Sequence, residues 1–216
     1  MPSTARLIVF PSTLKVIRNQ SFCVCPLETL VFPEGLERIE YAAFSGCSSL
    51  ISVTLPSTLS YLESHIFNDC TSLRSFSGKY ASADGRLLVD NGSVKAFAQG
   101  GLTEYTIPEG ITYATDGFDG YSDLPSLESL TLPSTLCTLA LRGQSITTLT
   151  SLATTPPSVT SSDYLYLPTV EAIYVPAGSI DAYKTASCWS SYADRIQAIP
   201  TSAGGGNEGT SEEAWN

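Results

Sequence analysis

The sequence predicts a β-rich solenoid, in which short coils of chain stack and bury a shared row of apolar side chains. Two observations carry this prediction. A seven-residue phrase, apolar-x-x-apolar-x-apolar-Pro, recurs along the chain, and its first prolines, Pro11, Pro33 and Pro56, are separated by 22 and 23 residues. Between these prolines the same apolar residue types return at the same offsets, so equivalent side chains are expected to lie one above another.

The phrase is clearest from Leu50 to Pro56, and a Pro-less copy begins at Ile146. The remaining copies are Ala5–Pro11, Leu27–Pro33, Leu102–Pro108, Leu127–Pro133 and Val170–Pro176. A period of about 20 to 29 residues with this apolar spacing is typical of leucine-rich repeats. The predicted fold class is therefore a leucine-rich-repeat solenoid, a right-handed coil with parallel strands on one face, a β-hairpin insertion and a C-terminal cap.

The three coils before residue 77 predict ladders of identical side chains. Phe22, Phe44 and Phe67 each follow a repeat proline by 11 residues, and Cys25, Cys47 and Cys70 by 14. Cysteines in one column have parallel side chains, so a buried packing role is favoured over a disulfide framework or a zinc site. Within one coil we expect full burial of Leu36, Ile39, Phe44, Cys47, Leu50, Val53 and Leu55.

The turns after the prolines are of two kinds, Pro-Ser-Thr and Pro-Glu-Gly. Pro-Ser-Thr occurs at Pro11, Pro56 and Pro133, and Pro-Glu-Gly at Pro33 and Pro108. Both suit a tight turn in which proline sets φ at the start. Gly35 and Gly110 are expected to adopt a backbone conformation that a side chain would resist.

The array is interrupted once and ends in a different pattern. Asn91-Gly92 between apolar runs predicts a hairpin within residues 77–101. Residues 102–152 resume the repeat less regularly, and residues 170–200 are expected to form a cap. There, Ser179 is the expected N-cap of a helix carrying Ile180, Tyr183 and Ala186, followed by Trp189, Tyr192 and Ile196 over the last coil. The prediction is thus one domain over residues 1–200, with 201–216 as a disordered tail or linker.

Composition excludes several function classes. The formal net charge of −10 disfavours a nucleic-acid partner, because nothing would neutralise the phosphates. No stretch approaches the ~20 apolar residues of a membrane span. A signal peptide is not expected from the opening residues, and since the first repeat is already under way there, the sequence is interpreted as trimmed or partial.

A family resemblance rests on the unit from Pro33 to Leu50, with its Pro-Glu-Gly-Leu start and Ala-Phe-Ser-Gly-Cys-Ser-Ser-Leu end. It resembles the BspA-like leucine-rich repeats of bacterial surface proteins. Gly78-Lys79-Tyr80 in the hairpin region and Tyr174-Val175-Pro176-Ala177-Gly178-Ser179 near the end are also similar to Bacteroides-type members. The resemblance implies a secreted or surface-anchored scaffold that binds other macromolecules. It brings no catalytic residues.

Few side chains suggest chemistry. His65 is the sole histidine; it could act as a general base with Asp69 on a shared helical face, but a polar residue of the convex side is favoured. Asp116, Asp119 and Asp123 form an acidic turn that either holds Ca²⁺ or is a solvated loop, and they do not match the EF-hand pattern. We therefore expect no catalytic residue, no metal site and no cofactor.

The more informative set is the outward-facing column of the repeated strand. It begins at Val9, and its candidate binding residues are Val31, Thr54, Thr106, Thr131, Thr150 and Tyr174. β-Branched residues favour any pleated surface, so strand propensity alone explains this column equally well. The functional interpretation is a flat, weakly charged concave binding face.

The sequence thus predicts a non-catalytic binding or adhesion scaffold at a bacterial surface. Its partner would be a protein or a glycan, including host-derived ones, and the chain itself is expected to be a monomer. A structural spacer that presents another domain is the first alternative. A hydrolase using clustered carboxylates is a more remote one.

Overall fold

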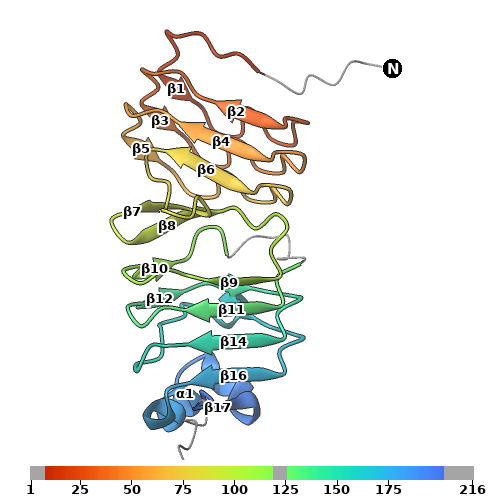
Figure 1. The fold of residues 1–216 in the computed structure, drawn as a ribbon, viewed down its shortest axis with the longest axis vertical. Coiled ribbons are helices and arrows are strands. Elements are labelled where there is room, and N and C mark those ends of the chain that lie inside the picture. Colours follow the sequence, from red (N-terminus) through yellow and green to blue (C-terminus); the bar gives the residue numbers. More distant parts are fainter. Residues whose placement is uncertain (1–7, 119–125, 202–216) are drawn as a thin grey trace, which may run out of the picture.

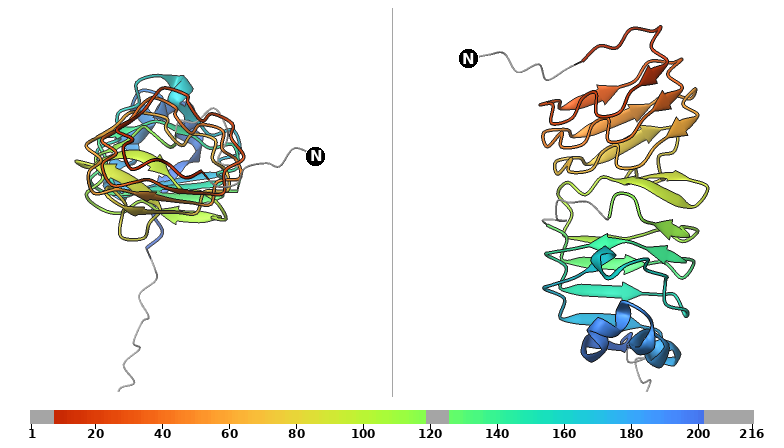
Figure 2. Two further views of the ribbon diagram at one scale, coloured as in Figure 1. Left: turned by 90° about the horizontal axis from the view of Figure 1, so that it is seen from above. Right: turned by 180° about the vertical axis from the view of Figure 1, so that it is seen from behind.

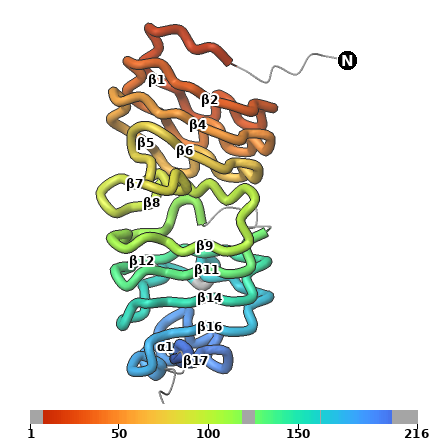
Figure 3. Tube along the Cα trace, in the orientation of Figure 1, coloured from red at the N-terminus to blue at the C-terminus, as the bar shows by residue number. Residues whose placement is uncertain are grey.

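The chain forms a column of stacked coils whose strands lie across its long axis (Figure 1). The computed structural model describes residues 8–118 and 126–201. Viewed from the end, successive coils superpose in one closed outline, and the tube trace descends coil by coil from the N-terminal to the C-terminal part (Figures 2 and 3). The predicted leucine-rich-repeat solenoid is therefore confirmed.

Two parallel ladders run along the first three coils. The repeated phrase forms one of them, in the order β2 (Thr29–Val31), β4 (Ser52–Leu55) and β6 (Ser75–Gly78). The other contains β1 (Val16–Ile17), β3 (Arg38–Ile39) and β5 (Tyr61–Leu62). Strands were expected on one face only. The second ladder forms around the apolar residue six positions after each proline, which is buried. Because this residue is fixed in the interior, it and the residue before it are extended and pair in register with the same two residues of the next coil.

The coils after residue 101 repeat this plan with longer ladders. The phrase strands are β9 (Glu104–Thr106), β11 (Ser129–Leu132), β14 (Thr148–Ser151), β16 (Ala172–Val175) and β17 (Ile196–Ala198). They form a sheet in the order β17-β16-β14-β11-β9, with parallel neighbours throughout. A separate parallel pair joins β13 (Leu141–Arg142) to β15 (Leu165–Tyr166).

An antiparallel hairpin lies between these two regions. Its strands are β7 (Leu87–Asp90) and β8 (Ser93–Phe97). Asn91 and Gly92 both have positive φ, 48° and 76°, as the Asn-Gly turn requires. The hairpin does not stand apart from the column: β8 also pairs with β10 (Tyr113–Ala114), which pairs with β12 (Thr138–Leu139).

The apolar ladders of the first three coils form as predicted, except that Phe22 and Cys25 at their N-terminal end are only half-buried. Each of the seven residues expected to be buried in one coil is at most 2% exposed. Phe44 stacks between Phe22 and Phe67, at ring-centroid distances of 5.2 and 5.7 Å. Cys47 and Cys70 are buried in the next column and donate their S–H groups to Phe22 O and Phe44 O. Each fully buried Leu or Phe contributes about 1.5–3 kcal/mol, so these ladders are the main stabilising contribution.

The described part of the first copy of the phrase, residues 8–11, does not form a strand. Ile8–Phe10 lie outside the ladders, and Val9 is 85% exposed. The ring of Phe10 nevertheless packs against Phe22 and Phe32, at 5.6 and 5.4 Å. This copy therefore keeps the apolar packing of the repeat but lacks its strand pairing.

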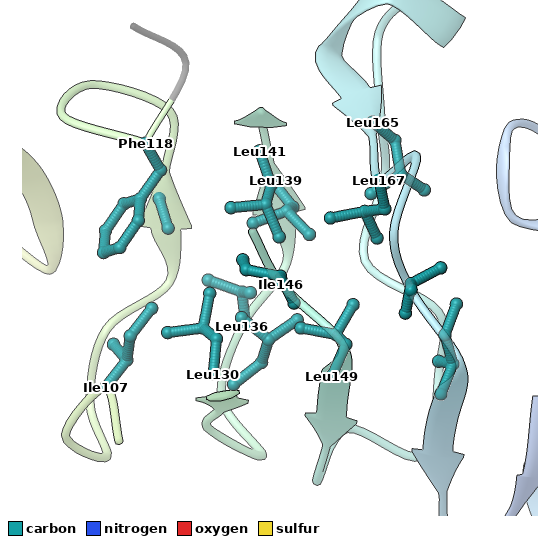
Figure 4. Close-up of a cluster of buried hydrophobic side chains, with 14 of the residues drawn as sticks. Ile107, Phe118, Leu130, Leu136, Leu139, Leu141, Ile146, Leu149, Leu165 and Leu167 are labelled. Atoms are coloured by element: carbon teal, nitrogen blue, oxygen red, sulfur yellow. The ribbon is translucent and has the colours of Figure 1, made fainter. Parts of the chain in front are cut away.

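The interior is divided into two apolar clusters, and the hairpin contributes to both. Leu87, Val94 and Phe97 pack with the coils that follow, a cluster that includes Leu130, Ile146 and Leu149 (Figure 4). Leu88, Ala96 and Ala98 pack with the three coils that precede. Successive residues of a strand point to opposite faces, so a hairpin across the column covers the end of one cluster and begins the next.

The two kinds of turn bind each other through a carboxylate clasp. Glu34 accepts hydrogen bonds from the N–H and hydroxyl of Ser57 at 3.1 and 2.9 Å, and Glu109 does the same with Ser134 at 3.0 and 2.9 Å. Hydrogen bonds from the serine N–H and then its hydroxyl lower the pKa of both carboxyls. Gly35 has the expected positive φ of 101°, and its N–H donates to Thr58 Oγ1.

Short helical segments pack at the end of the array. They are η1 (Ser162–Tyr164), η2 (Ala177–Ser179), α1 (Ile180–Thr185) and η3 (Trp189–Arg195). Ser179 precedes α1 as predicted, but its side chain makes no capping hydrogen bond. Among the described residues, no helix is long and apolar enough to cross a membrane.

Tyr183 and Trp189 are buried and Tyr192 is half-buried, and the polar group of each is hydrogen-bonded. Tyr183 Oη donates to Ala153 O at 2.9 Å and lies 2.7 Å from Ser151 Oγ, which therefore donates to it. Trp189 Nε1 donates to Pro157 O, and Tyr192 bonds the backbone on either side of Tyr166. Burial raises the pKa of Tyr183 to about 12. Ser151 stands where other copies carry an apolar residue, and its partner Tyr183 explains this departure.

Candidate functional site

The strand face is the outward surface of the phrase strands, and it contains every candidate binding residue. In the first sheet Val31 pairs with Thr54, which pairs with Ser77. In the second, Thr106, Thr131, Thr150, Tyr174 and Gln197 are consecutive partners. The candidates therefore form two separate rows rather than one, because the hairpin lies between β6 and β9. The coils stack in an almost straight column, so we call this surface the strand face rather than concave (Figure 1).

The two rows differ in exposure and chemistry. The first row begins with the apolar side chain of Val31, which is 57% exposed. It continues with Thr54 and Ser77, whose hydroxyl oxygens lie 2.9 Å apart. In the second row Thr106 is exposed, while Thr131, Thr150 and Tyr174 are half-buried by their neighbours. Neither the row from Val31 to Ser77 nor the row from Thr106 to Gln197 contains a charged side chain. Such a surface has a modest desolvation cost, because hydroxyl groups are less strongly hydrated than charges.

A hollow of about 390 Å³ opens on the second row. It lies over β9 and β11 and is lined by Glu104, Tyr105, Thr106, Ser129 and Thr131. Thr106 and Thr131, two of the predicted residues, are thus brought together at one depression. Glu104 supplies its single acidic side chain.

The loop before the hairpin fixes one wall of this hollow. Tyr105 donates its hydroxyl proton to Asp84 Oδ2 at 2.9 Å, and Asp84 also accepts from the Ser82 hydroxyl and the Arg86 N–H. Burial, and then the hydrogen bond to Asp84, raises the pKa of Tyr105 far above its usual range. Burial also raises the pKa of Asp84, but its three hydrogen-bond donors outweigh this effect and lower it. The tyrosine is therefore a neutral, fixed side chain at the edge of the hollow.

Two residues of the rows were missed by the sequence analysis. Ser77 belongs to a copy of the phrase, Leu73-x-x-Phe76-x-Gly78, in which glycine stands at the last apolar position and no proline follows. Gln197 lies in β17, after the helical segment, where the repeat has ended. The apolar spacing of Leu73 and Phe76 was a signal for the first, whereas no repeat signal precedes the second.

The structure describes only some of the residues considered for catalysis or metal binding. His65 and Asp69 lie in an irregular turn with positive φ, 60° and 64°, and not on a helical face. Among the described residues, no group of three His, Cys, Asp or Glu side chains could hold a metal ion. Asp116 lies in the turn after β10, whereas Asp119 and Asp123 lie outside the described residues. Ca²⁺ binding at this turn therefore stays a hypothesis.

The repeat geometry agrees with a comparison of the sequence with known families. The model of the BspA type leucine-rich repeat region matches residues 3–118, in six copies. The chain belongs to this family. BspA-type repeat proteins form scaffolds of the cell-surface type, which is the class that the sequence resemblance implied. The comparison with curated proteins found no significant match.

Two solved structures are similar to this BspA-type chain. One is a leucine-rich repeat protein from Bacteroides ovatus, with 17% identity and a TM-score of 0.46, over 80% of this chain and 58% of that one. The other is a leucine-rich cell surface protein from Faecalibacterium prausnitzii, with 16% identity and a TM-score of 0.43, over 87% of this chain and 70% of that one. The chain therefore spans less than two thirds of the length of the Bacteroides ovatus protein.

Proposed function

We propose that this protein is a non-catalytic binding scaffold of a bacterial surface, which recognises a protein or glycan partner through the strand face. The observation that carries the proposal is the hollow over β9 and β11, lined by Thr106 and Thr131 at the β9 end of a row without charged side chains. Family membership supports the scaffold role and the surface location.

The chemistry of the second row suits a contact surface. Its hydroxyl groups can donate and accept hydrogen bonds, and their desolvation is less costly than that of charged groups. Tyr174 continues the row beyond Thr150 and is half-buried. Tyrosine is enriched among the residues that contribute most to interface energies. Tyr174 is the expected anchor at one end and the hollow the receiving site at the other.

A structural spacer is the alternative that the experiment must separate from this proposal. A spacer needs a stable column but no specific contact on the strand face. A carboxylate hydrolase would need two acidic groups converging on one site, and the hollow has Glu104 alone among its lining residues. The strand face therefore supports binding better than it supports hydrolysis.

The test compares binding of purified extracellular proteins and glycans, displayed on an array, by the wild-type chain and Thr131→Arg. The arginine would place a long charged side chain in the hollow. We expect a ligand of the wild type to lose at least about tenfold in affinity, since the long side chain would occupy the hollow and its charge would have to be desolvated on binding.

Thr138→Arg is the matched control. It is the same substitution at another half-buried strand residue, on the β10–β12 ladder rather than the strand face. This variant should bind like the wild type, and both variants should unfold at similar temperatures. If all three proteins bind a ligand equally well, the binding site lies elsewhere on the molecule. If the wild-type chain binds no ligand on the array, the spacer function is favoured.

A further inference from the structure

A second hollow lies on the side of the column formed by the irregular turns of the first three coils. Its volume is about 210 Å³, and its polar and aromatic lining includes Gln20, Tyr41, Ser45, His65, Asn68 and Asp69. These residues come from three successive coils, so the hollow runs along the stack. It shares no residue with the hollow on the strand face.

Left-handed backbone positions build this hollow in a regular way. The residue nine after each repeat proline, Gln20, Ala42 or His65, has a φ between 51° and 60°. A second left-handed residue follows four positions later in each turn, at Val24, Gly46 and Asp69. Only one of these six is a glycine, and each non-glycine residue in this region costs of order 1–3 kcal/mol. The shape of the turn is therefore imposed by its neighbours.

Backbone hydrogen bonds between the turns hold this shape. Gln20 N–H donates to Tyr41 O at 3.0 Å, Phe22 N–H to Ala43 O at 2.9 Å, and Val24 N–H to Ser45 O at 2.8 Å. The same pattern repeats one coil further on, where Gly46 N–H donates to Asn68 O at 2.8 Å. The lining residues are thus fixed by main-chain contacts before any ligand arrives, which lowers the entropic cost of binding.

Asn68 is the residue in the hollow that points to a ligand. It is 9% exposed, and its Nδ2 is buried without a hydrogen-bond partner among the described residues. A buried donor left unbonded costs about 1–3 kcal/mol. Rotation about the broad terminal torsion of an asparagine can turn this amide toward a group seated in the hollow. A ligand oxygen would supply the missing acceptor.

An aromatic pair forms the rim. Tyr41 is 41% exposed, and its ring centroid lies 5.5 Å from that of His65 at an interplanar angle of 53°. The electron-rich face of an aromatic ring attracts the partly positive C–H groups of a neighbouring molecule. The hollow therefore offers an aromatic surface at its rim and hydrogen-bonding groups inside.

The lining excludes several classes of ligand. An anion would find no arginine or lysine among the lining residues, and it would lie close to the carboxylate of Asp69. A cation could contact Tyr41 and Asp69, but it could not accept a hydrogen bond from Asn68. An apolar ligand would leave the amide and hydroxyl groups unbonded. Pockets for drug-sized ligands have volumes of about 300–1,000 Å³, so this hollow suits a single ring.

We propose that this hollow binds one pyranose ring of a neutral glycan, with a face of the sugar against Tyr41 and a hydroxyl group accepting from Asn68. A pyranose has both of the required features, a face of C–H groups and hydroxyls that donate and accept. This site does not rest on the proposed role of the strand face, since the two surfaces share no residue.

The test is a chemical-shift titration of the ¹⁵N-labelled chain with D-glucose, D-galactose, N-acetyl-D-glucosamine and L-fucose, each up to about 50 mM, since a one-ring contact is expected to be of millimolar affinity. At least one sugar should give saturable shifts at the amides of residues 41–45 and 65–69. D-Glucuronate should bind more weakly than D-glucose, because its carboxylate would bring a further negative charge into a hollow lined by Asp69. L-Arginine serves as the cationic probe.

Two variants and one control complete the test. Tyr41→Ala should weaken the sugar by about tenfold or more. Asn68→Leu, which keeps the size of the side chain but removes the amide, should also weaken it. Tyr113→Ala removes a comparably exposed tyrosine, 50% exposed and outside this hollow, and should leave the affinity unchanged.

Three outcomes would overturn the proposal. The first is the absence of saturable shifts at these amides with all four sugars. The second is equal sugar affinity of the wild type and Tyr41→Ala. The spectrum of this variant will show whether it is folded. The third is saturation by L-arginine but not by any sugar, which would assign the hollow to a cationic side chain of a protein partner.

Discussion

The first three coils and the coils after the hairpin bury their apolar side chains in different ways. The first three repeat the same residue at several positions, so that Phe22, Phe44 and Phe67 form one stack. The later coils change shape from one level to the next, and their last level is covered by Tyr183 and Trp189 with bonded polar groups. Where layers are alike, ring stacking is sufficient. Where they differ, specific hydrogen bonds fix the packing.

The largest loss of stability is expected from a substitution in the first three coils. Phe44→Ala removes a fully buried ring from the middle of the stack and should lower the free energy of unfolding by about 3–5 kcal/mol. Phe22→Ala, at the half-buried end of the same stack, should cost less. Urea denaturation measures both changes.

Hydrogen exchange then shows how far the damage spreads. Because the two apolar clusters are separated at the hairpin, Phe44→Ala should accelerate exchange in residues 27–78 more than in residues 127–175. Equal acceleration in both regions would mean that the column unfolds as one unit and that the hairpin does not separate the clusters energetically.

A smaller effect is expected in the irregular half. Tyr183→Phe removes the hydroxyl that bonds Ser151 and Ala153 and should cost about 1–3 kcal/mol, because both partners stay buried. Adding Ser151→Ala should recover part of this loss, since it removes one of the unbonded groups. Thermal unfolding of the two single variants and the double variant measures this coupling.

The same tyrosine predicts a pH dependence. Its folded pKa of about 12 lies above the ordinary value of about 10, so the folded state retains a proton that the unfolded state releases. Stability from this group is complete below pH ~10 and is lost as pH rises through the folded value. Tyr183→Phe should flatten the decline of stability in this window. An unchanged decline would assign the alkaline sensitivity to other groups.

The smallest effect should be equal in the two halves. Glu34→Gln and Glu109→Gln weaken the carboxylate clasp once in each region and should lower the melting temperature slightly and to a similar degree. The folded pKa values are depressed, so this stability is present above the ordinary carboxyl pKa of about 4.3 and is lost as pH falls through the folded values. Below that window each variant should melt with the wild type. A persistent difference at low pH would contradict an ionic origin.

The sequence was sufficient for the parts of the fold that repeat. Apolar offsets from the prolines placed Phe44, Cys47 and Leu50 in the interior, because a stack admits only one register for them. It was insufficient where a strand has no strong signal of its own. Two-residue strands such as Val16–Ile17 arise only from a neighbour in register, and Ser151 has its meaning only beside Tyr183.

The candidate sites show the same limit. Alternation along the strand placed Thr106 and Thr131 outward, and both line the larger hollow. Tyr105 forms one wall of this hollow because its hydroxyl group bonds Asp84. Asp84 lies in a loop between two sheets, and no local sequence pattern reveals this contact. The hollow at Asn68 depends on three coils at once, so its residues are adjacent only after stacking.

The carboxylate clasp makes the single coil an incomplete unit of the sequence. Every Pro-Glu-Gly turn is followed by a coil with Pro-Ser-Thr, and the glutamate of one matches the serine of the next. An array extended by one coil would place like turns side by side and leave a glutamate or a serine unmatched. An array extended by two coils would preserve every match, so the unit that keeps all the clasps is a pair of coils, which corresponds to the spacing of 45 positions between Pro11 and Pro56.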